Sequence, residues 1–598
     1  MKNKSNSFSI DSLNNLYEMF CERASRSAND TAFRYFLPET NRWESSTWQD
    51  MSDEIAQWQA AFKQENLGPG DSVAIMLRNC KEWVAFDMAA LALGLIVVPL
   101  YTEDRADNVA YILNDANVQL MMIDGQEQWT RIHESLNTVT GLKRIISLSS
   151  MTGVPHDARL RWVKDWLPDS DNCCLETSSV KSDALATIVY TSGTTGRPKG
   201  VMLSHSNILW NVKAAVASVE TSTNDTMLSF LPLSHTLERT IGYYMAICTG
   251  VTIAYARSVM DLAEDMLTIK PTILISVPRI FERIYNKVQE QLMNKSGLAQ
   301  VLFRDAVEIG WGRFMAKQGR GNFRLSFLFH PLFKLLVSRK IKAKFGGNIR
   351  FCICGGAPLS ENIAKTFIGL GINILQGYGL TEHSPVISVN RMYDNVPASV
   401  GTSLPGMEIK TSDKGELMVR SPCVMMGYLN NKEATDEVID EDGWLYTGDL
   451  VEIRDKHIFI TGRLKEILVL SNGEKVPPSD IEMAIQEDPL FEQVMLVGEQ
   501  RPYLTLLVVL NKEVMIDLKR HHNIETENFD SEQLNPILLE HVAEQLKEFP
   551  GYAKVHQIGI SENPWTIDNA LMTPTMKLRR KQIHAHHAEL IESLYKGH

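Results

Sequence analysis

Helical and strand-like hydrophobic spacings alternate along most of the chain. Apolar residues recur at helical spacing over 52–62, and Thr47 followed three residues later by Asp50 predicts the start of that helix. The turn Gly-Pro-Gly-Asp at 68–71 separates this helix from a strand-like run at 72–77. Further short strands are predicted at 187–190, 227–231, 272–277 and 350–353. This alternation predicts an α/β fold, in which helices cover layered, mostly parallel sheets.

The pattern changes near Gly462, and the elements that follow are shorter. Strands are predicted at 495–499 and 503–510, and a helix at 536–549. A chain of 598 residues exceeds the size of a single hydrophobic core, so at least two domains are expected. We predict a large N-terminal domain over residues 1–462 and a small α+β C-terminal domain over residues 463–598.

The longest apolar run, at residues 88–100, is too short to cross a bilayer and contains a proline near its end. It predicts a buried helix that leads into a strand. The N-terminus lacks the apolar core of a secretory signal peptide. We therefore expect a cytoplasmic protein without a transmembrane segment.

The chain is acidic as a whole, with 60 Lys and Arg against 72 Asp and Glu and a formal net charge of −12. This balance disfavours general nucleic-acid binding. Residues 300–345 depart from it, because ten Lys and Arg stand there against Asp305 and Glu308, with large apolar residues between the cations. Such a segment is typical of a peripheral contact with an anionic membrane, here its inner face. A helix packed on the core with a basic outer face explains the same pattern, and both interpretations stay open. The oligomeric state is not indicated.

A loop rich in glycine and hydroxyl groups follows the strand-like run at 186–190. Its sequence from Tyr190 to Gly200 is YTSGTTGRPKG. Glycines let backbone N–H groups approach phosphate oxygens, hydroxyls add donors, and a lysine neutralises charge. A flexible surface turn is the alternative. The predicted phosphate-binding residues are Thr191, Ser192, Gly193, Thr194, Thr195, Gly196 and Lys199.

This loop resembles that of the adenylate-forming (AMP-binding) superfamily, which includes acyl-CoA synthetases, luciferases and peptide-synthetase adenylation domains. Further motifs match in the family's order: GGAP at 355–358, QGYGLTE at 376–382, GWLYTGDL at 443–450, GRLKE at 462–466 and PTMK at 574–577. The resemblance covers nearly the whole chain. Two segments, LPLSHTLER at 231–239 and VPRIFERIY at 277–285, resemble the long-chain fatty acyl-CoA synthetase branch in particular.

The resemblance implies a nucleotide site formed by several of these motifs. Tyr378 would offer an aromatic face to adenine, and Asp449 would accept hydrogen bonds from two ribose hydroxyls. Arg463 matches the family's second ribose contact. The nucleotide-binding residues implied outside the glycine-rich loop are Gly355, Gly356, Ala357, Tyr378, Thr381, Asp449 and Arg463.

The resemblance also implies the catalytic groups and a conformational change. Lys577 would stabilise the charge that builds on the α-phosphoryl oxygens, and Glu382 with Thr191 would bind Mg²⁺. His235 would lie near the carboxylate of the acid. Lys465 matches a hinge about which a mobile C-terminal domain rotates between two half-reactions. The implied catalytic residues are Lys199, His235, Glu382 and Lys577.

The implied activity is that of a long-chain fatty acid–CoA ligase, an ATP-dependent, AMP-forming acid–thiol ligase that uses ATP, Mg²⁺ and coenzyme A. It would form acyl-AMP and pyrophosphate from a fatty acid and ATP, and then acyl-CoA and AMP. Two alternatives stay open: a fatty acyl-AMP ligase that delivers its product to a carrier protein, and a non-catalytic lipid- or nucleotide-binding relative.

Overall fold

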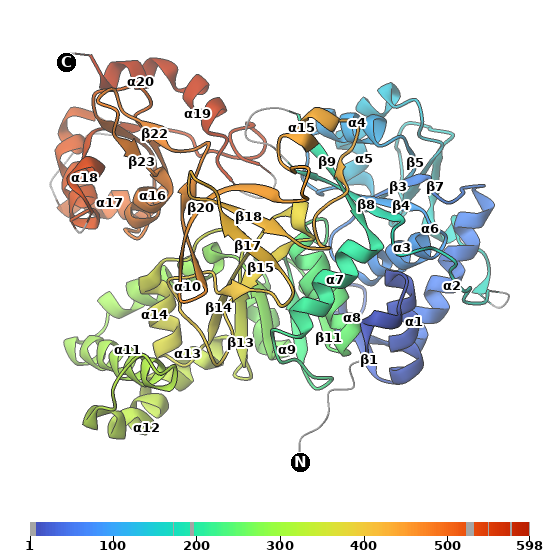
Figure 1. Ribbon diagram of the computed structural model, residues 1–598, viewed down its shortest axis with the longest axis horizontal. Helices are drawn as coiled ribbons and strands as arrows, with labels where there is room; N and C mark the ends of the chain where they lie inside the picture. Colours follow the sequence, from blue (N-terminus) through green and yellow to red (C-terminus); the bar gives the residue numbers. More distant parts are fainter. Residues whose placement is uncertain are drawn as a thin grey trace.

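The computed structural model of the protein describes residues 8–170, 173–191, 197–521, 531–547, 549–573 and 577–596. Figure 1 shows a broad body with two large sheets and surrounding helices, and a smaller body at one corner that the C-terminal part of the chain forms. The predicted α/β architecture with a small α+β C-terminal unit is confirmed.

The first large sheet has thirteen strands and a parallel centre. The strands of this centre are buried over most of their length, as in parallel sheets that helices cover on both faces. Because the strands are parallel, the loops after their carboxyl ends meet at one edge of the sheet. In spatial order they are β11 (Thr252–Tyr255), β10 (Thr226–Ser229), β12 (Ile273–Ser276), β13 (Phe351–Cys354) and β14 (Ile374–Gly379).

One limb of this sheet is antiparallel, which the sequence pattern did not predict. It comprises β15 (Val386–Val389), β16 (Thr402–Ser403), β21 (His457–Arg463), β20 (Leu445–Arg454) and β18 (Glu416–Arg420), followed by the edge strand β17 (Glu408–Thr411). Short turns join β17 to β18 and β20 to β21, and Gly415 supplies the left-handed backbone of the first of these turns with a φ of 79°. Short turns reverse the chain direction, whereas parallel pairing needs a long crossover.

The second large sheet has eight strands. Its core of β4 (Ile96–Pro99) and β3 (Ser72–Met76) is parallel, and β8 (Leu185–Thr191) pairs antiparallel with β9 (Lys199–Ser204). The predicted strands at 72–77, 187–190, 227–231, 272–277 and 350–353 are confirmed within two residues. The predicted helix start is confirmed as well: Thr47 and Asp50 form a reciprocal capping box at the start of α2 (Trp48–Gln64).

The C-terminal unit is built on a three-stranded sheet. Its strands are β24 (Phe491–Val497), β25 (Leu504–Leu510) and β26 (Val555–Ile560), and α16 (Pro478–Ile485) packs against β24. The helix predicted at 536–549 is α18, but it spans Ser531–Gln545, so Pro536 lies inside it and not at its start.

Residues 297–344 form a helical extension next to the first sheet, at the lower left of Figure 1. Its elements are α11 (Gly297–Lys317), a 3₁₀ turn at Leu325–Phe329, α12 (His330–Phe333), a π-helical turn at Lys334–Ser338 and α13 (Arg339–Lys344). Within the part of the chain that the structure describes, no helix combines the length and hydrophobicity needed to span a bilayer.

Candidate functional site

Asp449 is the centre of a hydrogen-bonded cluster at the edge where β14 meets the antiparallel limb. Pairing of β20 with β21 places Asp449 opposite Arg463, whose Nε donates to Asp449 Oδ1 at 2.7 Å. The Tyr378 hydroxyl at the end of β14 donates to Asp449 Oδ2 at 2.5 Å. Only 4% of Asp449 is exposed. Because a carboxylate offers about four acceptor positions, each oxygen can still accept a hydrogen bond from a ligand.

The tyrosine and arginine of this cluster are held by burial and by the carboxylate. Burial and the negative charge of Asp449 raise the pKa of Tyr378 far above its ordinary value. Asp449 likewise raises the pKa of Arg463 and more than offsets the opposing effect of burial. The tyrosine therefore stays protonated and the arginine stays charged, so both can donate to the Asp449 carboxylate of the predicted ribose-binding group.

Small residues line the next loop of the sheet, as predicted for an adenine site. Gly355 follows β13 directly, and its backbone N–H donates to the Ser276 carbonyl at 3.1 Å. Gly356 has a φ of 85°, a left-handed conformation that glycine adopts without strain, and it is exposed together with Ala357. Without large side chains here, the backbone beside β14 remains accessible to a planar ring.

Tyr428, which the sequence analysis missed, contacts both Glu382 and Lys199. The Tyr428 hydroxyl donates to Glu382 Oε1 at 2.8 Å, and Lys199 Nζ lies 4.8 Å from the centre of the Tyr428 ring. Pairing of β19 (Gly427–Tyr428) with β9 brings Tyr428 next to Lys199, which precedes it by more than 200 residues in the sequence. The sequence Gly-Tyr-Leu-Asn-Asn at 427–431 predicts only a turn, so it carries little signal for Tyr428.

Thr381 lies next to Thr236, the residue that follows His235 in the sequence. The Thr381 and Thr236 hydroxyls lie 3.3 Å apart, so Thr236 is a second neighbour that the sequence analysis missed. The Leu237 backbone N–H donates to His235 Nδ1 at 3.2 Å, which leaves the proton of the neutral ring on Nε2. Burial and the positive charge of Lys577 lower the pKa of His235 to about 4. The imidazole is therefore neutral near pH 7, with Nε2–H available as a donor.

The structure brings Lys577 into this neighbourhood although it comes from the C-terminal unit. Its backbone is held by Thr573, since the Lys577 N–H donates to Thr573 Oγ1 at 3.1 Å. Its side chain keeps contact with water, yet the surrounding protein and Arg463 together lower its pKa. Asp449, Glu466 and Glu382 act in the opposite direction. Lys577 thus lies within electrostatic reach of the predicted ribose, metal and carboxylate residues.

Lys465 lies exposed in a turn between β21 and β22 (Leu468–Val469), directly after the strand that carries Arg463. Backbone hydrogen bonds tie the turn to the large body, among them the bond from the Leu464 N–H to the Gly448 carbonyl at 2.8 Å. Its position between the two bodies agrees with the predicted hinge, which stays a prediction.

The predicted phosphate loop is described only at its ends. Thr191 at the end of β8 pairs with Lys199 at the start of β9, so the two ends of the loop lie side by side. The middle of the predicted loop, Ser192, Gly193, Thr194, Thr195 and Gly196, lies outside the described residues.

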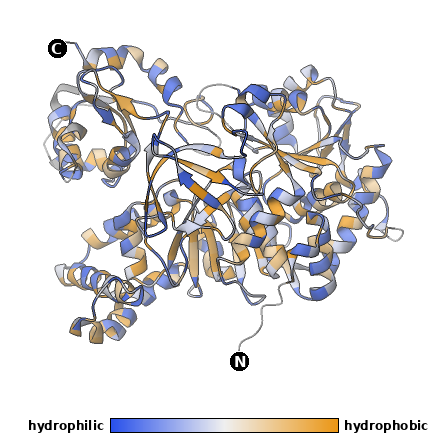
Figure 2. Ribbon diagram, viewed as in Figure 1, coloured by the Kyte–Doolittle hydropathy of each residue, from blue (hydrophilic) through white to orange (hydrophobic). Residues whose placement is uncertain are grey.

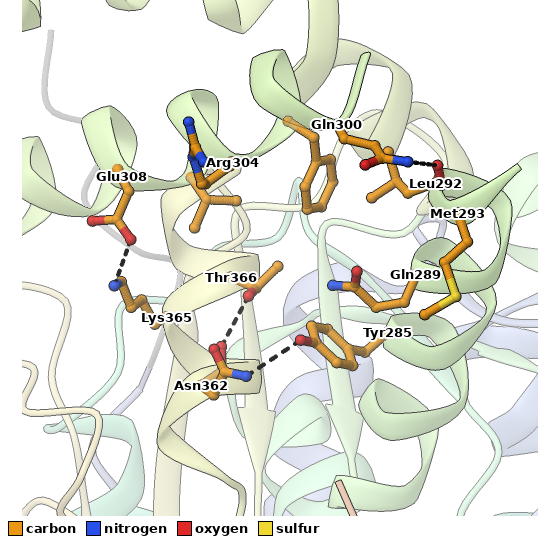
Figure 3. Close-up of a pocket in the computed structure, with 12 residues that line it drawn as sticks. Tyr285, Gln289, Leu292, Met293, Gln300, Arg304, Glu308, Asn362, Lys365 and Thr366 are labelled. Carbon is orange, nitrogen blue, oxygen red and sulfur yellow. Dashed lines mark hydrogen bonds and ion pairs between the residues drawn. The ribbon is translucent and has the colours of Figure 1, made fainter. Parts of the chain in front are cut away.

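A cavity of about 330 Å³ lies elsewhere, between α10 (Pro278–Met293), α11 and α14 (Glu361–Gly369). Figure 3 shows its polar lining, with an ion pair between Glu308 and Lys365 and a hydrogen bond from Asn362 to the Tyr285 hydroxyl. No predicted site residue lines it. The cavity is therefore separate from the cluster around Asp449.

Comparison with known proteins identifies the family. The sequence model of the AMP-binding enzyme family matches residues 20–429, and that of the AMP-binding enzyme C-terminal domain matches residues 465–598. The long-chain-fatty-acid–CoA ligase FadD15 of Mycobacterium bovis is 31% identical over 565 residues, covering 92% of each chain. The chloroplastic long-chain-fatty-acid–[acyl-carrier-protein] ligase AEE15 of Arabidopsis thaliana is 29% identical, covering 92% of this chain and 82% of its own.

The fold agrees with this assignment. The adenylation domain of the carboxylate reductase from Mycobacterium chelonae superposes with a TM-score of 0.76, at 22% identity, over 98% of this chain and 91% of that domain. The predicted resemblance, made from motifs alone, is thereby confirmed. This chain belongs to the AMP-binding enzyme family.

Proposed function

We propose that the protein is a long-chain fatty acid–CoA ligase that activates its acid as acyl-AMP. The observation that carries the proposal is the convergence of Lys577, Glu382 and Asp449 around one sheet edge, from three separate parts of the chain. A non-catalytic binding relative would not need a cation, a metal ligand and a ribose acceptor together. The similarity to FadD15, a long-chain-fatty-acid–CoA ligase, supports the choice of acid and thiol.

In this proposal the nucleotide lies across the carboxyl ends of β13 and β14. Adenine occupies the surface left open by Gly355, Gly356 and Ala357 and stacks on Tyr378. The ribose hydroxyls donate to the Asp449 carboxylate, whose orientation Tyr378 and Arg463 fix. The loop that includes Ser192–Gly196 binds the phosphates, with Lys199 as its cation.

The first half-reaction joins the acid to AMP. A carboxylate oxygen of the acid attacks the α-phosphorus, the new O–P bond forms, and the bond to the leaving pyrophosphate breaks. Lys577 stabilises the charge that builds on the phosphoryl oxygens, and the neutral His235 can donate Nε2–H to an oxygen of the acid. Because these donors are in place before the reaction, little reorganisation accompanies the transfer of charge.

The residues present fit a magnesium ion that the nucleotide helps to bind. The described residues contain no group of three or more His, Cys, Asp and Glu that could hold a metal alone, so phosphate oxygens must complete the shell. Glu382, held by Tyr428, would be the protein ligand, with Thr191 beside the phosphates. The metal would neutralise phosphate charge and orient the leaving group.

The second half-reaction transfers the acyl group. The thiolate of coenzyme A attacks the acyl carbon, the C–S bond forms, and the acyl–phosphate C–O bond breaks to release AMP. We propose that the domain over residues 463–598 rotates about Lys465 relative to residues 1–462, which withdraws Lys577 and exposes the acyl-AMP to the thiol.

Two finer statements belong to the same proposal. The acceptor is coenzyme A, and a carrier-protein thiol is the alternative, since AEE15 is named as an acyl-carrier-protein ligase. The protein is cytoplasmic and reaches its substrate by peripheral contact with the inner face of an anionic membrane through residues 300–345.

A chain-length series tests the proposal. AMP release is measured with acids of increasing chain length, in the presence of coenzyme A, of a phosphopantetheinyl carrier protein, or of neither. We expect activity to rise toward long chains and to require coenzyme A for multiple turnovers. Turnover with the carrier protein alone would establish the alternative acceptor, and the absence of acyl-AMP with every acid would refute the proposal.

A further inference from the structure

The helical extension exposes a cluster of large apolar side chains at its outer end. Phe323, Leu325 and Leu328 are 71%, 78% and 69% exposed. Of twenty large hydrophobic side chains exposed in the described part of the chain, seven fall within the fourteen residues 323–336. We call this cluster the apolar tip; its members are Phe323, Leu325, Leu328, Phe329, Leu332, Leu335 and Leu336. Figure 2 shows hydrophobic and hydrophilic residues mixed on these short helices at the periphery of the molecule.

The tip is presented by a well-anchored scaffold. Gly310 of α11 packs so closely on α14 that a Cβ there would lie 1.8 Å from the Gly369 carbonyl oxygen. Phe327 is buried on α11, where a Cβ at Gly312 would come within 2.9 Å of its ring. Ile341 of α13 is buried in the core beneath the first sheet. The segment is therefore fixed on both sides of the tip, and the exposed side chains belong to an ordered surface.

Cations surround the tip, and the stretch of sequence that contains it has no acidic residue. From Ile309 to Phe345 the sequence has nine Lys and Arg and neither Asp nor Glu, within a chain of net charge −12. Arg320 pairs with Asp394, which draws it away from the tip. Six others are exposed, and among the described residues no ion pair includes them. Four of these six lie within the tip segment or directly after it: Arg324, Lys334, Arg339 and Lys340.

We infer that the apolar tip and its four cations form a docking surface for an anionic lipid bilayer. Large aliphatic and aromatic side chains enter the acyl boundary, while lysine and arginine remain at the level of the headgroups and attract the negative surface. A second copy is disfavoured as the occupant, because two such faces would place like charges against each other. This inference rests on the proposed function and deepens it, because it assigns the membrane contact proposed for residues 300–345 to particular side chains, none of which is a proposed catalytic residue.

Cosedimentation with vesicles tests the docking surface with the full-length protein. Phosphatidylglycerol–phosphatidylcholine vesicles are compared with pure phosphatidylcholine vesicles at low and high salt. The tip variant combines Leu325→Gln, Leu328→Gln and Leu332→Gln. Its matched control combines Met260→Gln with Leu267→Gln, which are exposed apolar residues elsewhere on the surface. The charge variant combines Lys334→Gln, Arg339→Gln and Lys340→Gln.

We expect the wild type and the control to bind anionic vesicles and to be released in part by salt, which screens the charges but not the apolar insertion. The tip variant should bind at least tenfold more weakly at every salt concentration. The charge variant should bind weakly and lose its salt dependence. All four proteins should adenylate a short, soluble acid equally, so a failed docking test is distinct from a failed function.

Three results would overturn the inference. The wild type could stay in the supernatant at low salt, the tip variant could bind like the wild type, or the wild type could bind pure phosphatidylcholine equally well. Sedimentation velocity without vesicles tests whether a second copy of the chain occupies the surface instead. A dimer that forms with the wild type and the control but not with the tip variant would show this, and lipid docking would then be rejected as well.

Discussion

Replacing Lys577 by methionine should separate the two half-reactions. The Lys577→Met variant keeps the length of the side chain and removes its charge. An ammonium about 4 Å from a phosphoryl oxygen, at an effective dielectric constant of about 20, contributes about 4 kcal/mol. If that interaction forms in the transition state, its loss slows adenylation by about a thousandfold. The pKa of Lys577 lies below its ordinary value of 10.5, so wild-type adenylation should also begin to fall at a lower alkaline pH than for an unperturbed lysine.

Two assays on the same protein check this prediction. Pyrophosphate release reports adenylation, and acyl-CoA formation from supplied acyl-AMP reports the thioester step, which should remain within a few-fold of wild type. Lys581→Met is the matched control, because Lys581 is an exposed cation on the neighbouring helix α19 (Arg580–His586). The reasoning is wrong if both half-reactions fall together, or if the control loses adenylation to the same extent.

Three further perturbations probe the site and the core. Asp449→Asn should raise the KM for ATP about tenfold to a hundredfold, since hydrogen bonds to a charged group contribute about 1.5–3 kcal/mol; an unchanged KM in a steady-state ATP titration would remove Asp449 from the ribose site. Burial raises the pKa of Glu238 from 4.5 to about 8, so its carboxyl is neutral in the folded and ionised in the unfolded protein between these values. Folding stability should therefore decline as the pH rises through that window, by at most about 5 kcal/mol, and urea titrations of Glu238→Gln should show a weaker decline. Asp87→Ala would leave the buried Arg239 without its carboxylate and should cost about 3–5 kcal/mol in urea unfolding, whereas Glu408→Ala, which removes an exposed partner of Arg420, should cost far less; equal losses would contradict this reasoning.

The sequence predicted the parts of the fold whose signals are local. Thr47 and Asp50 predicted a helix start because both partners of a capping box lie within one turn. The strands β8, β10, β12 and β13 were predicted because buried parallel strands form short apolar runs with breaks on either side. The antiparallel limb was missed, since hydrophobic spacing does not carry the direction in which a strand pairs.

The candidate site likewise contains residues that local motifs predicted and residues that only the fold brings in. Asp449, Lys577 and Glu382 were predicted because each lies in a short motif, and the order of those motifs identified the family. Tyr428 could not be predicted, because its contact with Glu382 exists only after β19 pairs with β9. A pairing between distant strands depends on the whole sheet, and no local pattern encodes it.

The sequence by itself determined the family of this protein and the residues proposed as its phosphate loop, metal ligand and catalytic lysine. The tertiary structure decided which groups act together. It buried His235 and brought Lys577 toward it from the end of the chain, which together lower the pKa of the imidazole, and it left the apolar tip outside the core. Composition could not separate a membrane surface from a packed helix, because whether a leucine is buried depends on which neighbours the fold places over it.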